Sequence, residues 1–145
     1  ARVKRPAVPS ARRRADQRIA AIDIGSNSIR QIIADVSPQG SIRVIDEMKA
    51  SPRLGAGVAE TGALSESAMG QALDALGRMA KLATHSGAKR LEVVATSAVR
   101  EASNAPDFVA RAKRVTGLRV RILSGEEEAM LAFRSALAHF EIGTG

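Results

Sequence analysis

Two short apolar segments, residues 18–24 and 28–36, stand on either side of the small polar tip "GSNS", residues 25–28. Each segment has the length and the content of β-branched residues expected of a strand, and a short polar tip joins antiparallel neighbours. The first segment is almost wholly apolar, which indicates a strand buried on both faces. This hairpin constrains the fold most, because it begins a sheet that the rest of the chain must extend or cover.

The segments that follow alternate between strand-like and helix-like patterns. A third strand is expected to carry Ile42, Val44 and Met48 on one face, and the glycine-rich residues 51–64 predict a loop. Apolar spacing, caps and turn residues predict the remaining elements, which are a helix between Ser65 and Gly87, a strand over 90–96, a helix between Asn104 and Gly117, a strand over 118–123 and a helix over 124–140.

This order predicts an α/β fold, a mixed five-stranded sheet with three helices, in which right-handed crossovers follow three antiparallel strands. Three regions are expected: a basic disordered tail over 1–18, one subdomain over 19–123 and a connecting helix over 124–145. In the second helix, Asn104 is a possible cap, and the face directed at the core is expected to hold Phe108, Val109, Ala112 and Val115.

Most of the net charge of +7 lies at one end of the chain. Residues 1–18 hold seven basic residues and one acid, with almost no large apolar side chain. Such a segment cannot bury enough surface to offset its ordering entropy. It is expected either to act as a solubilising extension or to bind polyanions without specificity. Added salt would weaken such binding.

The chain has no cysteine and only two histidines, which argues against disulfides and against a zinc centre. A reducing, cytoplasmic location is therefore expected. No apolar run approaches the roughly 20 residues of a membrane span, and the first residues lack the apolar centre of a secretory signal. We expect a soluble protein.

The hairpin tip has the composition of an anion cradle. Gly25 lets the backbone approach an anion, successive amides at a tight turn can form a concave nest, and short polar side chains follow at Ser26, Asn27 and Ser28. Asp23, at the strand end beside the tip, suits a metal ion or a water next to phosphate. An ordinary surface hairpin explains the same residues.

Two further stretches carry polar residues at the ends of strands. Thr96, Ser97 and Arg100 follow a strand at its carboxyl end, where ligands of open α/β sheets lie, and arginine suits a phosphoryl group. The alternative is a capped helix with a solvated arginine.

The other stretch is "SGEEEA", in which Ser124 and Glu127 form an S-x-x-E capping box and leave Glu128 the carboxylate most available as a general base. The neighbouring acids are expected to raise the pKa of one another, and Glu127 is a weaker candidate for a metal ligand. Three solvated acids in the first turn of a helix are the alternative.

Five stretches in this order, "AAIDIGSNSIR", "RLGAGV", "LSESAM", "VVATSAVREASNAPDF" and "ILSGEEEAMLAF", resemble the exopolyphosphatase and guanosine pentaphosphate phosphohydrolase family. The resemblance runs from about Ile19 to Phe133. It implies an actin-like, ribonuclease-H-type subdomain, with an active site in the cleft between it and a second subdomain.

The resemblance also implies roles for residues. The "DxGSNS" loop, here Asp23 and residues 25–28, would bind phosphate, Arg100 would contact substrate phosphates, and Glu128 would be the base. The implied reaction releases orthophosphate from polyphosphate or guanosine pentaphosphate with a magnesium ion, and a homodimer is expected for the full-length protein.

One departure from the family pattern is the absence of its second phosphate loop, "D-[IL]-G-G-G-S", before Gly145. The chain is therefore expected to be an incomplete half of the site and inactive alone. Two alternatives stay open: half of an actin-like kinase or ATPase, and a non-catalytic module that binds polyanions.

Overall fold

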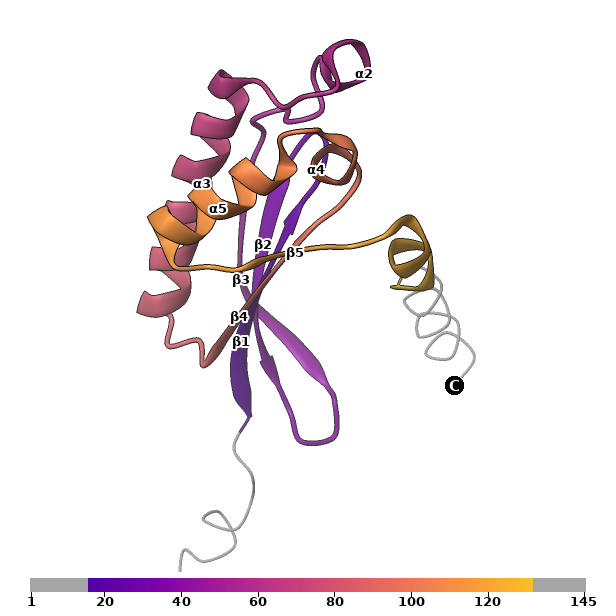
Figure 1. Ribbon diagram of the computed structural model, residues 1–145. Helices are drawn as coiled ribbons and strands as arrows, with labels where there is room; N and C mark the ends of the chain where they lie inside the picture. Colours follow the sequence, from indigo (N-terminus) through magenta and orange to yellow (C-terminus); the bar gives the residue numbers. More distant parts are fainter. Residues whose placement is uncertain (1–15, 132–145) are drawn as a thin grey trace, which may run out of the picture.

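The computed structural model describes residues 16–131, and its centre is a five-stranded sheet (Figure 1). The strands are β1 (Gln17–Ile24), β2 (Ile29–Val36), β3 (Ile42–Ala50), β4 (Arg90–Ala95) and β5 (Val120–Ile122), in the spatial order β3-β2-β1-β4-β5. The first three strands pair antiparallel, and β4 and β5 extend the sheet in parallel. The predicted mixed sheet is confirmed.

Helices connect the parallel strands. The described helices are α2 (Val58–Thr61), α3 (Glu66–His85), α4 (Ser97–Glu101), α5 (Ala105–Thr116) and a last one over 125–131. The three predicted helices correspond to α3, α5 and the last helix. The two short helices were not predicted: α2 lies within the expected loop, and α4 directly follows β4.

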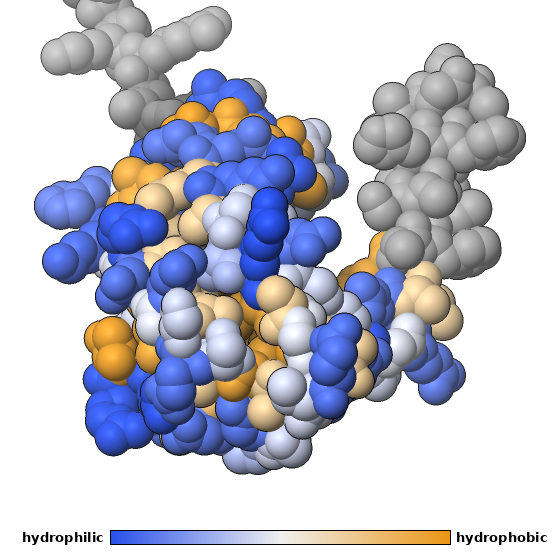
Figure 2. Space-filling model, turned by 90° about the horizontal axis from the view of Figure 1, so that it is seen from above, coloured by the Kyte–Doolittle hydropathy of each residue, from blue (hydrophilic) through white to orange (hydrophobic). Residues whose placement is uncertain are grey.

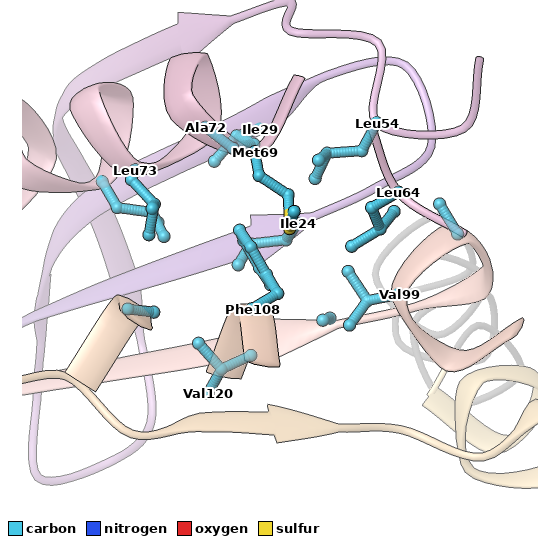
Figure 3. Close-up of a cluster of buried hydrophobic side chains, with 14 of the residues drawn as sticks. Ile24, Ile29, Leu54, Leu64, Met69, Ala72, Leu73, Val99, Phe108 and Val120 are labelled. Atoms are coloured by element: carbon cyan, nitrogen blue, oxygen red, sulfur yellow. The ribbon is translucent and has the colours of Figure 1, made fainter. Parts of the chain in front are cut away.

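One face of the sheet carries the core. In β1, Ala20, Ile22 and Ile24 are buried, whereas Ala21 and Asp23 between them are exposed. The expectation that this strand is buried on both faces is therefore wrong, because α3 and α5 cover the same side of the sheet (Figure 1). Phe108 of α5 is fully buried at the centre of the cluster in Figure 3, near Met69 of α3 and Ile24 of β1.

The register of β3 also departs from the prediction. An irregularity between Ile33 and Ala34 of β2 skips Ile45, so Val44 pairs with Ala34 and Met48 pairs with Gln31. Residues directly opposite each other share a face of the sheet. Val44 and Met48 therefore lie on opposite faces, because a bulge reverses the alternation that the sequence pattern assumed.

The helix ends confirm some caps and correct others. The side chain of Ser65 accepts a hydrogen bond from the amide of Ala68, as expected of an N-cap. Asn104 stands at the N-cap position of α5, but its side chain makes no capping hydrogen bond, because it instead bonds both the amide and the carbonyl of Leu64. Val115 is 62% exposed, so the predicted core face of α5 ends at Ala112.

The sheet begins earlier than expected. β1 begins at Gln17, one residue before the predicted strand of 18–24, so the expected tail over 1–18 overlaps the sheet at Gln17 and Arg18. The predictions for residues 1–15 and for 132–145 lie outside the described residues. Over the part of the chain that the structure describes, no helix is long and apolar enough to span a membrane.

Candidate functional site

The tip between β1 and β2 is a loop in which one amide is bonded to the protein and three amides are free within residues 16–131. The amide of Gly25 donates to the carbonyl of Ser28 at 3.0 Å, and a Cβ at position 25 would lie 3.2 Å from that oxygen. Within residues 16–131, the amides of Ser26, Asn27 and Ser28 donate no hydrogen bond. Three free successive amides are the donors of an anion-binding nest.

A segment distant in sequence holds this loop in place. The amide of Arg53 donates to the carbonyl of Asn27 at 3.1 Å, and the amide of Gly55 donates to the carbonyl of Ser26 at 2.8 Å. A Cβ at Gly55 would lie 3.0 Å from the Cβ of Ser26, so the close approach requires glycine. The sequence analysis assigned no role to these residues, although the motif "RLGAGV" contains both.

The end of β4 meets the same loop. β1 and β4 are parallel neighbours, with Ile24 opposite Ala95, so the residues after β4 emerge beside the tip. The hydroxyl oxygens of Ser26 and Ser97 lie 2.6 Å apart, and the amide of Thr96 donates to the carbonyl of Ile24 at 3.0 Å. Thr96 makes no side-chain cap, which leaves the capping alternative without support.

Arg100 and Glu128 form an ion pair beside this corner. Nη1 of Arg100 donates to the carbonyl of Leu123 at 2.9 Å and to Oε2 of Glu128 at 3.1 Å. Among the described residues, Nε and Nη2 of Arg100 have no partner. A guanidinium has five N–H groups, so the remaining three can still bind an anion while Nη1 holds the carboxylate.

Asp23 lies in the electrostatic field of Glu128. Although the residue is exposed as a whole, partial desolvation of its carboxyl raises the pKa of Asp23, and the nearby charge of Glu128 raises it further. The fold therefore brings together two carboxylates and the guanidinium of Arg100. No group of three or more potential ligands for a metal ion occurs among residues 16–131.

Glu127 is engaged elsewhere. Its amide donates to Oγ of Ser124 at 3.0 Å and its Oε1 accepts from the amide of Ser124 at 3.2 Å, which confirms the predicted capping box. This backbone hydrogen bond, followed by the ion pair with Arg121, lowers the pKa of Glu127. The expected rise is wrong for this residue, because these donors lower its pKa more than burial raises it.

A cavity of about 660 Å³ adjoins the tip, and its lining includes Ser26, Asn27 and Ser28 together with Lys49 and Arg53. Asp23, Arg100 and Glu128 are not part of its lining. Figure 2 looks onto the end of the molecule at which α2 and α4 lie, and hydrophilic residues cover most of the surface seen there. Sequence reasoning missed Lys49 and Arg53, because neither stands in a motif with a stated role.

Comparisons with known proteins place the chain in a family. The sequence model of the Ppx/GppA phosphatase family matches residues 32–144. Exopolyphosphatase 1 of Mycobacterium leprae is 31% identical over 128 residues, which cover 88% of this chain and 38% of that protein. The guanosine-5'-triphosphate,3'-diphosphate pyrophosphatase of Vibrio cholerae is 36% identical over 126 residues, which cover 87% of this chain and 25% of that protein.

A solved structure shows the same fold. The crystal structure of the Aquifex aeolicus member of the Ppx/GppA family superposes with a TM-score of 0.74 at 38% identity, covering 78% of this chain and 37% of that one. Ppx/GppA structures have the actin-like ATPase fold, so the predicted fold class is confirmed. The chain spans well under half the length of these relatives.

Proposed function

Because this chain belongs to the Ppx/GppA phosphatase family, we propose that it carries half of the active site of an enzyme that releases orthophosphate from polyphosphate or guanosine pentaphosphate. The names of the two relatives support these substrate classes. The observation that carries the proposal is the set of free amides at Ser26, Asn27 and Ser28, beside an arginine that is ion-paired with a glutamate.

The loop and Arg100 bind the terminal phosphoryl group in this proposal. The free amides of the tip donate to its oxygens, and Nε and Nη2 of Arg100 supply a planar fork that fits two oxygens at once. Ser97 keeps the hydroxyl of Ser26 directed through their mutual hydrogen bond. These donors also stabilise the charge that develops on the phosphoryl oxygens during transfer.

Glu128 acts as the general base. Its carboxylate accepts a proton from a water whose oxygen attacks the terminal phosphorus, while the bond between phosphorus and the bridging oxygen breaks. The electron pair of that bond leaves with the shortened chain, and orthophosphate is the other product. Nη1 of Arg100 positions the carboxylate by holding Oε2.

The residues present fit a magnesium ion of the kind that shares its coordination with substrate. Mg²⁺ in phosphate sites uses one or two carboxylates and completes its shell with water and phosphate oxygens. Asp23, whose pKa is raised in part by Glu128, is the carboxylate whose charge such a cation would offset. The ion would neutralise phosphate charge, with Asp23 as its protein ligand, whereas Glu127 is occupied by Ser124 and Arg121.

A change of Glu128 to Gln tests the assignment. The amide oxygen can still accept from Arg100, but it cannot take a proton, so kcat should fall by roughly a hundredfold or more. The affinity for substrate should stay within a factor of about two of the original. Steady-state kinetics of phosphate release with magnesium present, together with calorimetric binding, measure both in a polypeptide extended to the length of the relatives.

The matched control is Glu126→Gln in the same helical turn. Glu126 is exposed and makes no salt bridge among the described residues. This variant should keep most of the activity, because it removes the same charge without touching Arg100. Unchanged turnover in the Glu128 variant, or equal losses in both variants, contradicts the role of Glu128.

A homodimer and a cytoplasmic location, both expected above, belong to this proposal. Light scattering coupled to size-exclusion chromatography tests the first, and fractionation of cells tests the second.

A further inference from the structure

The cavity beside the tip has the chemistry of an anion site distinct from the Arg100–Glu128 pair. It shares Ser26, Asn27 and Ser28 with the phosphate loop, and Lys49 and Arg53 bring two cations to it. One acid, Glu101 of α4, is also part of the lining. The ionised groups of the lining thus carry one net positive charge, and serine hydroxyls and free amides supply further donors.

The two cations are not engaged in salt bridges. Neither Lys49 nor Arg53 forms one within residues 16–131. Other arginines of the fold are used structurally, as Arg18 is with Asp35 and Arg111 with Glu66. The charges at the cavity are therefore available to a ligand, whereas those of Arg18 and Arg111 are held by carboxylates.

The backbone of Arg53 is held in an unfavourable conformation. Its φ is 53°, and it is the one non-glycine residue with a positive φ among the described residues. Its amide bonds the carbonyl of Asn27, and its own carbonyl accepts from the amide of Ala56 at 3.0 Å. Such strain persists where the surroundings over-determine it, and it is frequent in ligand clamps.

We infer that this cavity binds a second phosphoryl group of the substrate, next to the group that reacts, through Lys49 and Arg53. The inference rests on the proposed function and deepens it. The ligand class is a condensed phosphate, in which successive groups carry charge along one chain. An inorganic polyphosphate and the phosphate arms of guanosine pentaphosphate share this chemistry.

The phosphate loop links the two positions. Its free amides lie in residues that both line the cavity and adjoin Ser97, which precedes Arg100 on α4. A chain of two or more phosphoryl groups can therefore contact the loop and the cavity cations together. A single orthophosphate needs only one of the two positions, and this difference separates the subsite from a general attraction to anions.

Arg53→Gly is the sharpest variant, because glycine adopts a positive φ without strain and the fold is kept. Lys49→Ala removes the other cation. Each change should weaken the binding of tripolyphosphate roughly fivefold to tenfold and raise its KM by a similar factor, with kcat nearly unchanged. Inhibition by orthophosphate should change less than about twofold.

Two further variants test the direction of the charge effect on binding and provide a control. Glu101→Gln removes the acid of the lining, so it should tighten tripolyphosphate binding, by roughly twofold to fivefold. Lys81→Ala removes an exposed lysine from α3, far from the cavity in sequence and absent from its lining, and should have little effect. Thermal unfolding of Arg53→Gly should show stability equal to or above that of the parent protein.

Calorimetry of the purified chain with tripolyphosphate, guanosine pentaphosphate and orthophosphate tests the inference, and steady-state kinetics test it in a polypeptide extended to the length of the relatives. If the cation variants lose affinity for tripolyphosphate alone, or for guanosine pentaphosphate alone, the subsite is supported and the condensed phosphate that it binds is identified. The inference is overturned if the cation variants lose affinity equally for orthophosphate and the condensed phosphates, or if neither variant loses affinity for any of them. If a polypeptide extended to the length of the relatives binds tripolyphosphate but hydrolyses nothing, the proposed function fails while the binding comparison still decides the subsite.

Discussion

Gln31 is a buried polar side chain without a polar partner. It lies on β2 between Ile22 of β1 and Met48 of β3, on the face of the sheet that α3 covers. It is fully buried, and neither Oε1 nor Nε2 has a hydrogen-bond partner among the described residues. A buried amide left unpaired costs about 1–3 kcal/mol, so this residue lowers the stability of the core.

A change of Gln31 to Met should therefore stabilise the protein. Methionine has a similar length and no strong polar atom, so the free energy of unfolding should rise by about 1–2 kcal/mol. Chemical denaturation measures it, and Gln71→Met on the exposed side of α3 is the control, with an expected change below about 0.5 kcal/mol. A fall in stability for the Gln31 variant would contradict the unpaired state of its amide.

At the scale of elements, Asp35 of β2 ties the sheet together at the end away from the site. It accepts from Nε and Nη2 of Arg18 in β1, at 2.8 and 3.1 Å, and from Nη2 of Arg43 in β3 at 3.1 Å. Arg18 also donates to the carbonyl of Ser86, which follows α3, at 2.8 Å. This network joins three strands to the end of the longest helix.

The network predicts a dependence of stability on pH. The hydrogen bond from Arg18 lowers the pKa of Asp35, so the ionised carboxylate stabilises the fold at neutral pH. That contribution is complete above the ordinary aspartate pKa of about 3.9 and is lost as pH falls through the lowered value. Asp35→Asn should lower Tm at pH 7 by a few degrees, and the difference from the parent protein should shrink below about pH 4.

Thermal unfolding followed by circular dichroism over this pH range tests the prediction. Asp74→Asn is the control, since Asp74 is exposed on α3 and makes no salt bridge among residues 16–131. The role of Asp35 is refuted by a difference in Tm that stays constant down to pH 2.

At the scale of the whole molecule, the described fold gathers its free polar groups at one end of the sheet. The free amides, Arg100 and the cavity cations all lie near the ends of β1 and β4 and the segment after β3. The chain spans 38% of one relative and 25% of another, so most of each relative has no counterpart here. We propose that part of that remainder supplies the facing wall.

The chain by itself should therefore bind tripolyphosphate weakly and release no orthophosphate at a useful rate. A water attacking phosphorus needs groups on both sides of the transferred phosphoryl group, and one wall supplies only the base and part of the charge stabilisation. Phosphate release is measured with magnesium for this chain and for a polypeptide extended to the length of the relatives. Magnesium-dependent release by the shorter chain at a rate near that of the longer one would show that one wall suffices.

The sequence by itself determined what depends on neighbouring residues. The order of strands and helices followed from periodicity, and the caps at Ser65 and Ser124 followed from residues within one helical turn. The polar tip of the hairpin was also visible, because its composition is local. The bulge in β3 and the role of Asn104 were not, since each depends on a partner in another element.

Only the tertiary structure decided how the candidate site is assembled. The amide of Arg53 meets the carbonyl of Asn27, Ser97 meets Ser26, and Arg100 holds Glu128. These partners are separated by 26 residues or more along the chain, and pairing of strands and packing of helices on one face bring them together. The physical reason is that local patterns record which residues are polar, whereas a site requires the directions in which distant segments present them.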